Sequence, residues 1–95
     1  MKKNSPEDKR KLKDLACVGP ATESDLHVLG IRRVEQLKKW SGEDLYSALC
    51  EKTGVEHNIC CLDVFNCAVA QANDPHLPKE KCDWWYWTNV RKTSL

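Results

Sequence analysis

The segment Val18-Gly19-Pro20-Ala21 combines residue types that let a chain bind a phosphate group through its backbone. Backbone N–H groups at the start of a helix have no partners inside the helix, and the helix dipole adds partial positive charge there. Glycine permits both a tight turn and a close approach of the ligand. Pro20 suits the first position of a helix, and Thr22 adds a hydroxyl donor. The segment therefore predicts a turn whose backbone can contact a phosphate.

Six cysteines and three histidines are the next candidates for chemistry. Zinc sites take four nitrogen or sulfur ligands from paired, closely spaced motifs. His57 and Cys60 have such a spacing, but Cys67 and Cys82 do not form a second pair. We therefore predict no metal and no cofactor. Cys60, Cys61 and Cys67 are expected to pack in the core, where a free cysteine behaves as a small apolar side chain.

Cys17, directly before the turn, is the one thiol whose position near a helix end could make it reactive. The chain has no Cys-x-x-Cys motif, no catalytic carboxylate pair, no nucleophile elbow and no Walker loop. We therefore expect a protein without enzyme activity and without a small-molecule substrate.

The run Trp84-Trp85-Tyr86-Trp87 holds most of the aromatic surface of the chain. It could stack on the bases of a single strand, or close the core as a C-terminal lid. The large apolar area of each ring favours the lid. Not every ring of the run can point inward, so a patch for a protein partner stays open as well, made of Trp84, Trp85 and Trp87.

Length and charge limit these possibilities. A chain of 95 residues predicts one domain, which we place at residues 1–88, followed by a loose tail at 89–95. The net charge is only +1, but residues 1–40 carry ten Lys and Arg against six Asp and Glu, a net charge of +4. The remaining residues carry five basic and eight acidic side chains, a net charge of −3. This asymmetry predicts a basic face in the N-terminal half, or simply a solvated surface of mixed charge.

Targeting signals are also informative. Met1-Lys2-Lys3 is followed by polar residues rather than by the apolar run of a secretory signal. No segment is long enough to span a membrane. We therefore expect a cytoplasmic protein that makes no membrane contact and keeps its cysteines reduced.

The helical periodicity of apolar residues predicts an all-α fold, a compact bundle of about five helices. No stretch shows the sustained alternation that is typical of a strand. The helices are expected from Ser5 to about Ala16, from Pro20 to Val28 or Leu29, from Val34 to about Trp40, from Ser41 to Lys52, and from Asn58 to Ala72. Gly30 and Gly54 are expected to end the second and fourth of these helices.

The predicted helix at 58–72 is apolar around most of its circumference, with Asp63, Asn66 and Gln71 as a narrow polar stripe. A helix that is apolar on nearly all sides is a buried one, so we expect it at the centre of the bundle. Residues 73–81 are expected to form a loop, because Pro75 and Pro78 disfavour regular structure.

Residues Leu15 to Leu37 resemble the helix-hairpin-helix family. The resemblance rests on residues 14–22, Asp25-Leu26, Leu29-Gly30-Ile31 and Val34-Glu35-Gln36-Leu37. It implies contact with DNA phosphates, independent of base sequence, around Gly19. The residues that we expect to contribute to this contact are Val18, Gly19, Pro20, Ala21, Thr22, Lys13, Gly30, Arg32 and Arg33.

A closer resemblance covers most of the chain. The order of the motifs above, followed by Leu45-Tyr46, Leu49-Cys50, Val64-Phe65, Cys67-Ala68-Val69 and Trp84-Trp85, is similar to the bacterial "pathogenicity locus" family. These are small helix-hairpin-helix proteins related to a mitomycin-resistance group. The resemblance implies the fold more directly than it implies a biochemical function.

Three residues depart from the usual hairpin. Cys17 stands where glycine is common, and a left-handed backbone at a non-glycine residue costs about 1–2 kcal/mol. Glu23 and Asp25 put two carboxylates near the expected phosphate. Binding to DNA is therefore expected to be weak and strongly dependent on salt. The leading hypothesis is a non-catalytic DNA-binding module, and the alternative is a protein-interaction adaptor that uses the tryptophans and has a purely structural hairpin.

Overall fold

The structure of the chain is a computed structural model that describes residues 10–93. Within this range it forms five α-helices and two short 3-10 helices, with no strand. In chain order the elements are η1 (Leu12–Asp14), α1 (Pro20–Val28), α2 (Val34–Leu37), α3 (Gly42–Thr53), α4 (Cys60–Asn73), η2 (Lys79–Cys82) and α5 (Trp84–Thr93). The predicted all-α fold is therefore confirmed.

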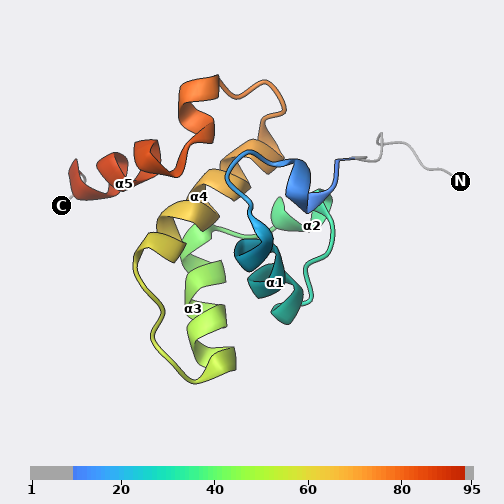
Figure 1. The fold of residues 1–95 in the computed structure, drawn as a ribbon, viewed down its shortest axis with the longest axis vertical. Coiled ribbons are helices and arrows are strands. Elements are labelled where there is room, and N and C mark those ends of the chain that lie inside the picture. The colour runs from blue at the N-terminus through green and yellow to red at the C-terminus, as the bar shows by residue number, and fades with distance from the viewer. Residues whose placement is uncertain (1–9, 94–95) are drawn as a thin grey trace, which may run out of the picture.

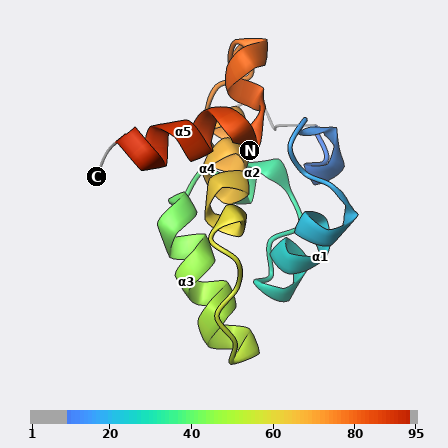
Figure 2. The same ribbon diagram turned by 60° about the vertical axis from the view of Figure 1, so that its left-hand side comes forward.

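Helix α4 lies at the centre of the molecule, as its apolar sequence predicts. In Figure 2 it stands between α3 and α1, and α5 crosses it. Phe65, Ala68 and Ala72 of α4 are buried in the main core. The other buried members of that core come from every element up to α3 and from the turns between them: Leu12, Leu15, Val18, Leu26, Ile31, Val34, Leu37, Leu45 and Leu49.

Helix α3 begins and ends where the sequence predicts. The Ser41 side chain accepts a hydrogen bond from the backbone N–H of Asp44 at 3.0 Å, which is the usual N-cap arrangement. At the other end Gly54 has φ +74°, a left-handed conformation that glycine adopts at little cost.

The first turn of α3 approaches α4 very closely at Gly42. A Cβ atom at this position would lie 2.0 Å from Asn66 Oδ1 and 2.8 Å from the backbone nitrogen of Asn66. Only a residue without a side chain fits there, because the backbone of α4 cannot move aside. Gly42 therefore fixes how near the two helices can lie.

The N-terminal elements are shorter than the sequence predicts. Residues 10–16 form only the 3-10 helix η1, and the predicted start at Ser5 lies outside the described residues. Helix α2 is one turn long and ends at Leu37, although the predicted helix reached about Trp40. Figure 1 shows these elements joined by extended connections beside α1. Buried leucine and valine side chains hold these segments in the fold, and helical hydrogen bonds contribute little to their position.

The C-terminal segment differs from the prediction in the opposite direction. Residues 89–93, predicted as part of a loose tail, continue α5 as far as Thr93. The helix is held by polar contacts with α4, described below, and such contacts cannot be recognised from the spacing of apolar residues. Part of the predicted loop at 73–81 is also ordered, because η2 begins at Lys79.

Candidate functional site

The hairpin loop, which we define as residues 15–19, connects η1 to α1. Leu15 and Val18 are buried and anchor the loop in the core, whereas Gly19 is exposed. The backbone N–H of Glu23 donates to the carbonyl of Gly19 at 2.9 Å and closes the first turn of α1. The N–H groups of Ala21 and Thr22 come before that bond and have no partner inside the helix. The start of α1 therefore presents two backbone donors at the surface.

Gly19 is not required by the fold. Its backbone is extended, with φ −93° and ψ −179°, a conformation that any residue adopts. A Cβ atom added there would meet no atom within 4 Å. No side chain caps the start of α1. The absence of a side chain at Gly19 thus leaves the two backbone donors open to solvent without serving the packing.

Cys17 does not carry the strain that the sequence comparison suggested. Among the described residues, positive φ occurs only at Gly30 and Gly54. The hairpin loop therefore turns without a left-handed residue, and cysteine at position 17 costs nothing in backbone energy.

The turn at Gly30, the second glycine turn in the segment that resembles helix-hairpin-helix proteins, differs from the turn at Gly19 in its backbone donors. Gly30 has φ +81° and ends α1, as predicted. The backbone N–H groups of Arg32 and Arg33 both donate to Gln36 Oε1, at 2.7 and 3.0 Å. Because these donors already have a partner, they are not available to a ligand in this conformation.

The structure places the predicted phosphate-binding residues at two ends of α1. Gly19, Pro20, Ala21 and Thr22 stand at its start, with Lys13 on the neighbouring η1. Gly30, Arg32 and Arg33 follow its end, and a nine-residue helix is about 13 Å long. These two groups cannot contact the same phosphate. Both Arg32 and Arg33 have exposed side chains.

Acidic side chains on α1 oppose an anion at its start. Glu23 lies in the first turn and Asp25 in the next, and both are half-buried. A carboxylate near the start of a helix interacts favourably with the helix dipole, but it also repels a second anion. The backbone geometry at the start of α1 therefore favours a phosphate, whereas the negative charge of the two carboxylates disfavours it.

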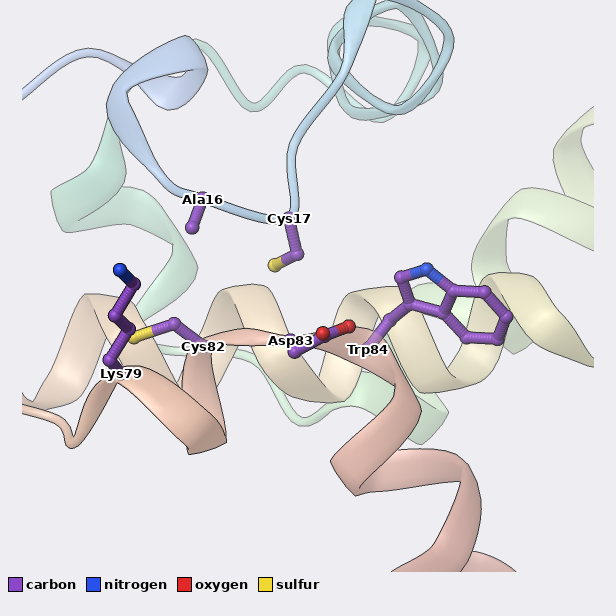
Figure 3. Close-up of a pocket in the computed structure, with 6 residues that line it drawn as sticks. All are labelled: Ala16, Cys17, Lys79, Cys82, Asp83 and Trp84. Atoms are coloured by element: carbon purple, nitrogen blue, oxygen red, sulfur yellow. The ribbon is translucent and has the colours of Figure 1, made fainter.

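A pocket adjoins the hairpin loop on the side away from α1. It has a volume of about 320 Å³ and is lined by Ala16, Cys17, Lys79, Cys82, Asp83 and Trp84. Figure 3 shows the side chains of Cys17 and Cys82 on opposite walls, with the ring of Trp84 at one end. The pocket lies between the hairpin loop and the η2–α5 segment.

Gln71, on α4, connects this helix to the hairpin loop. Its Oε1 accepts the backbone N–H of Ala16 at 3.0 Å. Its Nε2 donates to two sulfur atoms, Cys17 Sγ at 3.0 Å and Cys67 Sγ at 3.4 Å. The predicted polar stripe of α4 gave no sign of this role, because Gln71 is buried and two of its three partners are 54 and 55 residues away.

The cysteines of α4 do not share one environment. Cys67 is fully buried, as predicted, but Cys60 is exposed and Cys61 is half-buried. The prediction that all three pack in the core is therefore wrong for Cys60, which stands at the first residue of α4. Within residues 10–93, no three His, Cys, Asp or Glu side chains are grouped so that they could hold a metal ion.

His57 has a structural environment at the α3–α4 turn. Its ring Nε2 is 2.9 Å from Thr53 Oγ1, and its backbone N–H donates to Cys50 Sγ at 3.4 Å. Tyr46 donates its hydroxyl to the carbonyl of His57. These contacts hold the turn against α3.

The tryptophans of α5 are unequally buried. Trp85 keeps 61% of its surface exposed, whereas Trp84 and Trp87 are half-buried. The rings of Trp84 and Trp85 have centroids 4.9 Å apart, and Trp87 Nε1 donates to the carbonyl of Lys81 at 2.9 Å. The aromatic run therefore covers part of α4 and η2 and leaves one large ring in solvent.

A buried ion pair fastens α5 to α4, and sequence reasoning missed it. Asp63 is fully buried and accepts hydrogen bonds from Arg91 Nε at 2.8 Å, Arg91 Nη2 at 3.1 Å and Thr88 Oγ1 at 2.7 Å. Burial by itself would raise the pKa of Asp63. The hydrogen bonds from Arg91 and Thr88, together with the positive charge of Arg91, outweigh burial and hold the pKa below its usual value.

These observations define a small all-α protein in which hydrogen bonds from the hairpin loop and from α5 converge on one central helix. Comparison with known protein families gives a match over residues 5–93 to the family described as "Pathogenicity locus". The chain belongs to this family. No curated protein and no solved structure gives a significant match. Within residues 10–93, every helix is too short or too polar to cross a membrane.

Proposed function

We propose that this protein is a non-catalytic module that binds the sugar–phosphate backbone of DNA, independently of base sequence, through the start of α1. The observation that carries the proposal is Gly19. Its backbone conformation and its surroundings would accept any small residue, yet glycine leaves the adjoining donors uncovered. The resemblance to helix-hairpin-helix proteins supports the same interpretation.

The proposed contact uses four groups. The N–H groups of Ala21 and Thr22 face the phosphate, and the partial positive charge at the helix start attracts it. The hydroxyl of Thr22 and the exposed ammonium of Lys13 add to the attraction. Arg32 and Arg33, at the other end of α1, would contact a different phosphate of the same duplex.

Binding is expected to be weak. The carboxylates of Glu23 and Asp25 repel the ligand, so the attraction depends mainly on releasing counterions from the DNA. The affinity should therefore fall steeply as salt is added. A cytoplasmic location is part of the proposal, and the six free thiols are typical of that compartment.

Fluorescence anisotropy with labelled duplex and single-stranded DNA at low salt tests the proposal. Gly19→Asp is the sharpest variant, because aspartate caps a helix at least as well as glycine does but puts a negative charge at the phosphate site. We expect this variant to fold normally and to lose binding. Replacing Lys13 with Glu should weaken binding, and Lys52→Glu, the same charge change in the last turn of α3, should weaken it much less.

The double variant Arg32→Glu and Arg33→Glu tests the far end of α1. It should reduce both the affinity and the steepness of the salt dependence, because fewer counterions are released. The proposal is wrong if the native protein shows no salt-sensitive binding at tens of micromolar, or if Gly19→Asp binds as well as the native protein does.

The exposed ring of Trp85 favours a second candidate function, a protein-interaction adaptor. A large aromatic ring with 61% of its surface in solvent is a common anchor of protein interfaces. In this case the hairpin loop would be purely structural. The adaptor is favoured if the native protein self-associates or co-purifies with a partner, if Trp85→Ala loses that association, and if the native protein does not bind DNA.

A further inference from the structure

The sulfur atoms of Cys17 and Cys67 both contact the side-chain amide of Gln71, although 50 residues separate the two cysteines in the chain. Cys17 Sγ donates to the carbonyl of Val64 at 3.8 Å and accepts from Gln71 Nε2 at 3.0 Å. Val64 and Gln71 lie one turn before and one turn after Cys67 on α4. A sulfur atom that contacts both of them lies beside the turn of α4 that carries Cys67.

The two thiols also share their hydrogen-bonding environment. The same amide group of Gln71 donates to both sulfur atoms. The adjacent thiol of Cys17 lowers the pKa of Cys67 against the effect of its burial, and the amide of Gln71 lowers it further. The same contact, together with burial, raises the pKa of Cys17. Cys67 is therefore the thiol of the pair that ionises first, and Cys17 can pass its proton to it.

Their access to solvent differs. Cys17 lines the 320 Å³ pocket, whereas Cys67 is fully buried and is not among the lining residues. Figure 3 shows the sulfur of Cys17 projecting from the hairpin loop into the pocket. A small oxidant can reach Cys17, and Cys67 is positioned to react with the product. Cys17 belongs to a loop and not to a helix, so its backbone can adjust to the geometry of a new bond.

We propose that Cys17 and Cys67 are a redox modification site that closes to an intramolecular disulfide when a peroxide enters the pocket. In the first step the proton of Cys17 passes to Cys67, and the sulfur of Cys17 attacks one oxygen of the peroxide. The S–O bond forms, the O–O bond breaks, Cys17 becomes a sulfenic acid, and the hydroxide that leaves is protonated by solvent to water. In the second step the sulfur of Cys67 attacks the sulfur of Cys17. The S–S bond forms, the S–O bond breaks, and the hydroxyl group leaves with the proton of Cys67 as a second water. The two thiols lose two electrons, and these reduce the peroxide.

The disulfide would join the hairpin loop covalently to the central helix. A small dithiol such as dithiothreitol reverses it by thiol–disulfide exchange. The inference does not depend on the proposed binding of DNA, because it concerns only the thiols and the oxidant. Disulfides in reducing compartments are usually transient ones of this kind.

Peptide mapping of the full chain after treatment with hydrogen peroxide tests the inference. Remaining thiols are blocked with iodoacetamide, and the protein is digested with trypsin. Cleavage after Lys13 and Arg32 isolates Cys17, and cleavage after Lys52 and Lys79 gives a peptide with Cys60, Cys61 and Cys67. We expect these two peptides to be joined, with fragmentation placing the bond at Cys67, and we expect dithiothreitol to separate them.

Two variants complete the experiment. Cys67→Ser should abolish the linkage. Cys61→Ser, in the same tryptic peptide and half-buried on the same helix, should keep it. The count of reactive thiols in the native protein should fall from six to four. A bond from Cys17 to Cys82, disulfides formed only between molecules through Cys60, or no disulfide in the native protein would each overturn the inference, and mapping of the native protein decides this even if a variant fails to fold.

Discussion

The start of α1 and the junction of α4 with α5 differ in whether their polar groups have hydrogen-bond partners inside the protein. At the junction, the buried carboxylate of Asp63 has three hydrogen bonds from Arg91 and Thr88. In the described residues, no buried side-chain nitrogen or oxygen lacks a partner. At the start of α1, the N–H groups of Ala21 and Thr22 have no partner inside the helix and no side-chain cap, and they adjoin an exposed glycine that the fold does not need.

The difference separates residues that stabilise the fold from residues available for binding. A polar group satisfied inside the protein contributes to stability and has nothing left to offer a ligand. A donor left at the surface contributes little to stability and can bind. Substitutions in the two regions should therefore have different consequences, and the following predictions are arranged by the size of the expected effect.

Replacing Gly42 with alanine should cause the largest loss. The added Cβ would lie 2.8 Å from the backbone nitrogen of Asn66, so α3 and α4 must move apart. We expect the free energy of unfolding to fall by about 3 kcal/mol, the upper part of the range for overpacked sites. Urea denaturation measures it. Gly19→Ala is the matched control and should change stability by no more than about 0.5 kcal/mol. Equal losses in both variants would contradict the comparison.

Replacing Asp63 with asparagine should destabilise the protein by about 2 kcal/mol. This is below the range of about 3–5 kcal/mol for a fully buried pair, because a quarter of the Arg91 side chain remains in solvent. The freed α5 should become more sensitive to trypsin at Arg91. Limited proteolysis and urea denaturation together measure the effect, and Glu51→Gln, an exposed carboxylate of α3, serves as control.

The same carboxylate predicts a dependence on pH. Because the pKa of Asp63 is lowered in the folded protein, its stabilisation is fully present above the pKa of about 3.9 for an unfolded aspartate. It is lost as the pH falls below that value, through the lowered pKa of the folded state. Melting temperatures of the native protein and Asp63→Asn should therefore converge in acid. A constant difference from neutral pH to pH 2 would show that the ion pair is not the cause.

Replacing Gly30 with alanine should cost about 1–2 kcal/mol, because an alanine at φ +81° adopts a left-handed backbone. This variant allows a comparison of the two glycines that flank α1, because the backbone conformation requires glycine at position 30 and does not require it at position 19. Gly30→Asn, which tolerates the left-handed region better, should recover part of the loss. Thermal unfolding followed by circular dichroism provides the measurement.

Replacing Trp85 with alanine should have the smallest effect on stability, within about 0.5 kcal/mol, because most of the ring is in solvent. Trp87→Phe, on the same helix, should cost about 1 kcal/mol through the lost hydrogen bond to the carbonyl of Lys81. Urea denaturation of both variants measures the contrast. A larger loss in Trp85→Ala would mean that this ring belongs to the fold and not to a free surface.

Sequence reasoning succeeded where local signals determine the structure. Ser41 and Gly54 bound α3 as predicted, Gly30 ends α1, and the apolar composition of α4 correctly indicated a central helix. It failed at α5, because the contacts of Thr88 and Arg91 with Asp63 span 25 and 28 residues. Nothing in the local pattern of 89–93 indicates a helix held by a distant carboxylate.

The candidate sites show the same limit. The sequence indicated Gly19 and the start of α1, but it could not show that Gln36 occupies the backbone donors of Arg32 and Arg33. The sequence indicated Cys17 as a thiol that could be reactive, but it did not indicate a second cysteine beside it. Only the fold brings Gln71 and Cys67 to it, because these residues are distant in the chain.

The contacts of Arg10 join the start of the described chain to the end of the central helix, and they predict an order of assembly. Its guanidinium donates to the carbonyls of Gln71 and Ala72, at 3.0 and 3.1 Å, and thereby covers the end of α4. These contacts span 61 and 62 residues, whereas α3 and α4 are neighbours in the chain. Long-range contacts close only after the chain between them has been ordered. The segment of Arg10 and η1 should therefore dock last during folding and detach first during partial unfolding, so the amide hydrogens of residues 10–14 should exchange with solvent sooner than those of α3 and α4.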